Sequence, residues 1–78
     1  MDKQGLSTAI RKTANAVIDS LDPQRPPVQV FCIECALEAL ADVADDYGLN
    51  EIARQLLDRS QKIHIGKHAR PIEEVAIS

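Results

Sequence analysis

The chain has 78 residues, a formal net charge of −3 and a pI near 5.2. This length is that of one domain, and the acidic balance argues against binding of nucleic acid or a membrane surface through bulk charge. Apolar residues make up 45% of the chain but aromatic residues only 3%, which favours close-packed helices over a β-sandwich.

Neither a membrane span nor a secretion signal is expected. The sequence has no run of 18 apolar residues, and its start, MDKQGLSTAIRK, lacks the apolar segment of a signal peptide. We therefore expect a cytoplasmic protein whose two cysteines remain thiols.

Apolar spacing predicts a first helix over residues 6–21. One arc collects Leu6, Ile10, Ala14, Val17 and Leu21. Ser7 or Gly5 would begin this helix, and Asp22-Pro23 would end it. The opposite, solvent-facing side would carry Arg11, Lys12, Asn15 and Asp19. Residues 22–27 contain three prolines and predict a stiff connector.

A second helix is predicted over residues 28–47, although its first four residues, VQVF, could also form a short strand. Its apolar side would comprise Ile33, Ala36, Leu37, Leu40, Ala44 and Tyr47. Gly48 is expected to end the helix as the residue after the C-cap, and Leu49 is expected to pack back against it.

The third helix is predicted over residues 51–64, with Asn50 as its cap and Gly66 as its stop. Its inward residues would be Ile52, Ala53, Leu56, Leu57, Ser60 and Ile63. In the tail, residues 65–78, the segment PIEEVA favours a last short turn. The short link between the second and third helices predicts an antiparallel hairpin, with the first helix packed over it, in a single all-α domain. Because the apolar arcs exceed what three short helices can cover, we expect a homodimer.

A one-sided row of acids is the leading functional feature of the second helix. It comprises Glu34, Glu38, Asp42, Asp45 and Asp46, and no basic residue interrupts it. Phe31 and Cys35 fall within the same arc, and apolar groups rimmed by charge are typical of interfaces. Phe31 and the five acids therefore predict a contact face for a larger, basic protein, as expected of a regulator or adaptor that inhibits or recruits it.

An alternative is DNA binding, because Val43–Leu49 resembles the turn of a helix-turn-helix protein. This resemblance implies a dimeric regulator that reads DNA with Asn50, Arg54, Gln55, Arg59 and Lys62. Arg54 stands where such proteins bury a β-branched residue, and Asp45 and Asp46 would repel phosphate.

A second alternative is a zinc-stabilised module. The hairpin is expected to bring the Cys-x-x-Cys pair near the end of the third helix, which suggests a ligand set of Cys32, Cys35, His64 and His68. The 28 residues between Cys35 and His64 are far more than a zinc finger has. We favour packing residues without a metal or other cofactor, with Cys32 buried and Cys35 more accessible.

Catalysis is not expected. The Cys-x-x-Cys segment resembles the active-site segment of thioredoxins, but it lacks the Gly-Pro and the preceding Trp, and the chain has too few strand candidates for that fold. No nucleophile with a spaced base and no glycine-rich phosphate loop is present either. We expect a protein that is not an enzyme.

Overall fold

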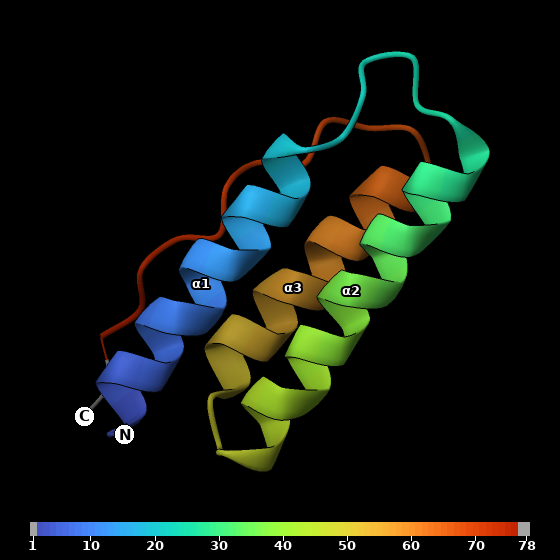
Figure 1. Ribbon diagram of the computed structural model, residues 1–78. Coiled ribbons are helices and arrows are strands. Elements are labelled where there is room, and N and C mark those ends of the chain that lie inside the picture. The colour runs from blue at the N-terminus through green and yellow to red at the C-terminus, as the bar shows by residue number, and fades with distance from the viewer. Residues whose placement is uncertain (1, 77–78) are drawn as a thin grey trace.

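A computed structural model describes residues 2–76, and over this range the chain forms three helices and no strand (Figure 1). They are α1 (Lys3–Asp19), α2 (Pro27–Asp46) and α3 (Asn50–His64). Helices α2 and α3 lie side by side as an antiparallel hairpin, and α1 packs mainly against α2. The predicted all-α fold and hairpin are confirmed, and VQVF is helical.

Helix α1 begins earlier than the sequence predicts. Asp2 is its N-cap, and the Asp2 carboxylate accepts a hydrogen bond of 2.6 Å from the Gly5 backbone N–H. An aspartate satisfies a free N–H group at a helix start, so neither Gly5 nor Ser7 begins the helix.

The connector between α1 and α2 contains one backbone turn, in which the Arg25 N–H donates to the Asp22 carbonyl at 2.8 Å, and side chains hold it to the helices. Gln29 accepts from the Asp22 N–H at 2.8 Å and donates to the Ser20 carbonyl at 3.1 Å, which closes the loop. The Arg25 guanidinium donates to the Ile63 carbonyl at 2.6 Å. The connector is therefore tied to the far end of α3.

A Schellman turn at Gly48 forms the hairpin between α2 and α3. Gly48 has φ +74°, and its N–H donates to the Asp45 carbonyl, while the Leu49 N–H donates to the Ala44 carbonyl. A glycine adopts this left-handed conformation without strain. Leu49 is buried, as predicted. Asn50 is the first residue of α3 instead of its cap, since Leu49 takes the N-cap position without a side-chain bond. Gly66 ends α3 with a second Schellman turn, as predicted.

The core is aliphatic and lies where the three helices and the tail meet. Its buried apolar residues are Ile10, Ala14, Ile33, Leu37, Ala41, Ala44, Leu49, Ile52, Ala53, Leu56, Ile63, Ala69 and Ile72. Two residues predicted to face inward do not: Tyr47 is 57% exposed and Leu57 is 51% exposed. Leu57 lies at the edge of its apolar arc, where a small change of helix rotation decides burial, whereas Tyr47 is the C-cap residue just beyond the end of α2.

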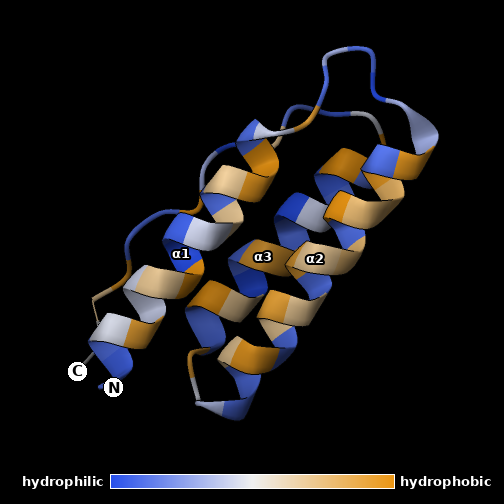
Figure 2. Cartoon of the chain, in the orientation of Figure 1, coloured by the Kyte–Doolittle hydropathy of each residue, from blue (hydrophilic) through white to orange (hydrophobic). Residues whose placement is uncertain are grey.

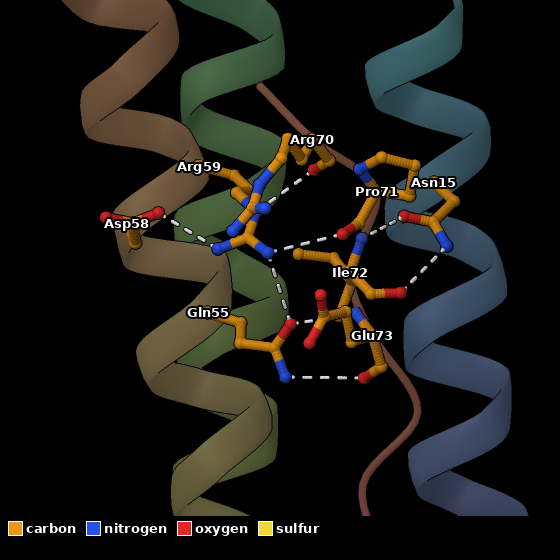
Figure 3. A network of polar contacts seen from close by, with 8 residues as sticks. All are labelled: Asn15, Gln55, Asp58, Arg59, Arg70, Pro71, Ile72 and Glu73. Carbon is orange, nitrogen blue, oxygen red and sulfur yellow. Dashed lines mark hydrogen bonds and ion pairs between the residues drawn. The ribbon is translucent and has the colours of Figure 1, made fainter. Parts of the chain in front are cut away.

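The tail does not form the predicted last turn. Residues 67–76 run as an extended segment back along α1 and α3 (Figures 1 and 3). Ala69 and Ile72 are buried, and Asn15, predicted to face solvent, is half-buried and bonds the Ile72 backbone. Helix side chains satisfy the tail backbone, so the tail needs no helical bonds of its own. Residues 77 and 78 lie outside the described range.

Candidate functional site

The exposed side of α2 carries apolar residues along its length, together with carboxylates. One stripe, here called the α2 stripe, consists of exposed residues opposite the buried side: Val28, Phe31, Cys32, Cys35, Ala39, Val43 and Tyr47. Phe31 is 66% exposed. Figure 2 shows apolar residues along both visible sides of α2, whereas α1 and α3 are strongly two-sided. Exposed apolar side chains that lie beside charged groups have the composition of an interface.

The acidic row follows one edge of the α2 stripe. Glu34, at the α3 side, is the least exposed member, with a side chain 17% exposed. Its carboxylate Oε1 lies 2.9 Å from His64 Nδ1. Four acids of the row form no ion pair within residues 2–76: Glu38, Asp42, Asp45 and Asp46. Four carboxylates beside the stripe are thus open to an external cation.

The C-terminal end of α2 strengthens this negative field. Its last turn contains Asp45 and Asp46 and no basic residue. The helix dipole places a partial negative charge at this end, so each carboxylate there costs about 0.3–1 kcal/mol. Lys3 approaches from α1, with its Nζ beside Gly48, but it makes no ion pair with either aspartate among the described residues. A cationic partner would relieve this repulsion.

The five residues suggested for DNA binding do not form one exposed surface. Arg59 is only 7% exposed, and its guanidinium donates to the Arg70 and Pro71 carbonyls. Gln55 bonds the backbone of Glu73. Arg54 pairs with Glu51 at 2.8 Å, and both are exposed. Asn50 is exposed and Lys62 is half-buried. Two of the five side chains are therefore already bonded to the tail.

The four suggested zinc ligands are not brought together. Cys32 and Cys35 are both exposed in the α2 stripe, whereas His64 contacts Glu34 and His68 lies on the tail. No three His, Cys, Asp or Glu side chains in residues 2–76 are grouped as metal ligands. The expected burial of Cys32 is wrong, because it lies about 100° around the helix from the buried Ile33. Both thiols instead extend the apolar surface.

Sequence reasoning missed one polar cluster, formed by Asn15, Gln55 and Arg59. These side chains come from α1 and α3 and converge on the tail (Figure 3). A signal for Arg59 was present, since it is three residues after Leu56 and four before Ile63, both buried. That spacing marks an inward position.

Comparisons with protein-family models, curated proteins and solved structures gave no match for this chain. Over residues 2–76, no helix combines the length and the apolar character needed to cross a membrane. Function must therefore be inferred from the surfaces of the molecule.

Proposed function

We propose that this protein is a small cytoplasmic regulator or adaptor that binds a larger, basic protein through the outward face of α2, and so inhibits or recruits it. The observation that carries the proposal is the exposed α2 stripe with unpaired carboxylates along one edge. The contact residues are Phe31, Glu34, Glu38, Asp42, Asp45 and Asp46.

The stripe supplies the affinity in this proposal. Phe31 and Val28 are the most exposed of its large side chains. Full burial of one such side chain contributes about 1.5–3 kcal/mol. Aromatic anchors surrounded by smaller apolar groups are typical of the residues that dominate binding energy.

The acidic row supplies the choice of partner. Lysine or arginine side chains along one edge of the partner would pair with Glu38 and Asp42 and offset the dipole at Asp45 and Asp46. Such pairing accelerates association, and the acceleration falls as salt screens the charges. A basic partner therefore fits this face better than a neutral one.

A second copy of the chain fits this face less well. Antiparallel pairing of two α2 stripes would place the two acidic rows on the same side, where like charges oppose association. The homodimer expected from the size of the apolar arcs is compatible with parallel pairing, which puts the rows on opposite sides. Sedimentation of the purified protein determines whether the chain pairs with a second copy.

The experiment compares two double variants of equal charge. Glu38→Lys with Asp42→Lys changes the acidic row, whereas Glu73→Lys with Glu74→Lys makes the same change in net charge on the tail, where both residues are exposed. Proteins captured from a lysate of the source cell by the wild type are then rebound to each variant at low and high salt. Phe31→Ala tests the stripe separately.

We expect the α2 variant to lose the partner at least tenfold at low salt, and the tail variant to retain it. Circular dichroism should show equal helix content in all variants, because every substituted side chain is exposed. If both double variants bind equally well, or if Phe31→Ala has no effect, the face of α2 is not the interface.

A further inference from the structure

The tail occupies a groove between α1 and α3. These two helices contact each other little, since α1 packs mainly on α2, and residues 70–73 lie between them (Figure 3). From residue 68 to residue 76, the tail makes no backbone–backbone hydrogen bond with the described chain. Helix side chains alone hold its backbone.

Three side chains hold four successive residues of the tail. Asn15 donates to the Ile72 carbonyl at 3.3 Å and accepts from the Ile72 N–H at 2.6 Å. Gln55 makes the same two-way pair with Glu73, at 3.3 and 2.8 Å. The Arg59 guanidinium donates to the carbonyls of residues 70 and 71, at 3.0 and 3.2 Å. All six bonds end on backbone atoms, so they recognise an extended chain irrespective of its side chains.

Apolar side chains add a simple sequence preference. Ala69 and Ile72 are buried and Val75 is half-buried, whereas the four residues between them are exposed. A spacing of three residues is that of a polyproline II strand, in which every third side chain shares a face. The groove therefore accepts a small residue, a branched apolar residue three positions later, and a second branched apolar residue three positions after that.

Arg59, one of the three side chains that hold the tail, also makes bonds within α3. Arg59 bonds Asp58 at 2.9 Å and Gln55 at 3.4 Å. Because these contacts do not involve the tail, they can hold the guanidinium near its position when the tail leaves. Bonds to charged donors that are already oriented lose less entropy on binding.

We propose that the groove between α1 and α3 is a docking site for an extended peptide segment of a separate protein, with the pattern small-x-x-Ile-x-x-Val, and that the tail is its resident occupant. A partner segment binds by displacing the tail, which is held by side chains alone. This site shares no residue with the α2 face and is independent of the function proposed for that face.

The test uses a fluorescein-labelled peptide of residues 67–76, KHARPIEEVA, added to full-length protein. Ile72→Ala in the protein removes the main anchor of its own tail and should weaken tail docking by about thirtyfold or more. The peptide should then bind this variant at least tenfold more tightly than the wild type, as measured by fluorescence anisotropy. A peptide that carries Ile72→Ala is the matched control and should not bind.

A second variant guards against loss of folding. Glu73→Pro removes the N–H that donates to Gln55 without opening a cavity in the core, and it should improve peptide binding about fivefold. Adding Gln55→Ala or Asn15→Ala to either variant should reverse the gain. Circular dichroism verifies that each protein remains helical.

Three results would overturn the proposal. One is a folded Ile72→Ala or Glu73→Pro variant that does not bind the peptide. Another is binding that Gln55→Ala and Asn15→Ala leave unchanged, since the peptide would then lie elsewhere. The third is a wild-type dimer that dissociates when the peptide is added, because the groove would then serve a second copy of the chain.

Discussion

Replacing Arg59 with alanine should lower the free energy of unfolding by about 3–4 kcal/mol. The variant loses two charge-assisted bonds to tail carbonyls, at 3.0 and 3.2 Å, each worth about 1.5–3 kcal/mol. Water can reach the tail and replace part of these bonds, which favours the lower end of each range. The pair with Asp58 adds less than about 1 kcal/mol, because the Asp58 side chain is 48% exposed.

This loss is large for so small a domain. A chain of 78 residues has a total stability of about 4–12 kcal/mol. Urea unfolding followed by circular dichroism at 222 nm measures the change, and the midpoint should fall accordingly. Arg59→Lys should recover less than half of the loss, since an ammonium group cannot reach two carbonyls as a planar fork does.

Arg54→Ala is the matched control on the same helix. Arg54 is exposed and pairs only with Glu51, three residues earlier, so its removal should cost no more than about 0.5 kcal/mol. If the free energies of unfolding of Arg59→Ala and Arg54→Ala differ by less than about 0.5 kcal/mol, the bonds from Arg59 to the tail do not stabilise the fold. The tail would then not be docked as described.

Two further predictions test the core and the α2 stripe. Leu56→Ala should lower the free energy of urea unfolding by about 2–5 kcal/mol, because Leu56 is fully buried. Leu57→Ala should change this free energy by less than about 0.5 kcal/mol. Equal losses in the two variants would contradict the orientation of α3. Cys32 and Cys35 should both react with Ellman's reagent in native protein, since both are exposed, whereas a thiol that reacts only in denaturant would contradict the exposure of the stripe.

The helices and their hairpin were predictable because their signals are local. Prolines before α2 and glycines at 48 and 66 mark element ends through backbone conformation alone. Helix α3 departs from prediction by one residue at its start. The start of α1 was wrong by three residues, because Asp2 precedes the apolar pattern and caps the helix from outside it.

The tail was not predictable in the same way. Its conformation depends on Asn15 and Gln55, which are 57 and 18 residues distant from their partners. Polar residues at the edge of a helix are usually solvated, and nothing local indicates that these amides meet another segment. The period of three in Ala69, Ile72 and Val75 becomes meaningful only when an extended chain lies in a groove.

The α2 stripe could not be predicted from the sequence for a different reason. Apolar periodicity correctly predicted that Ile33, Leu37 and Ala44 face inward. It did not predict the α2 stripe, because the apolar residues of α2 are not confined to one side of the helix. The strongly two-sided α1 and α3 each offer one apolar face, and both faces are used against one side of α2 and the tail. Phe31, Cys35 and Val43 consequently remain in solvent. The chain has no further apolar face to cover the outer side of α2, which is why we propose that a partner covers it, and the carboxylates on that side favour a basic partner.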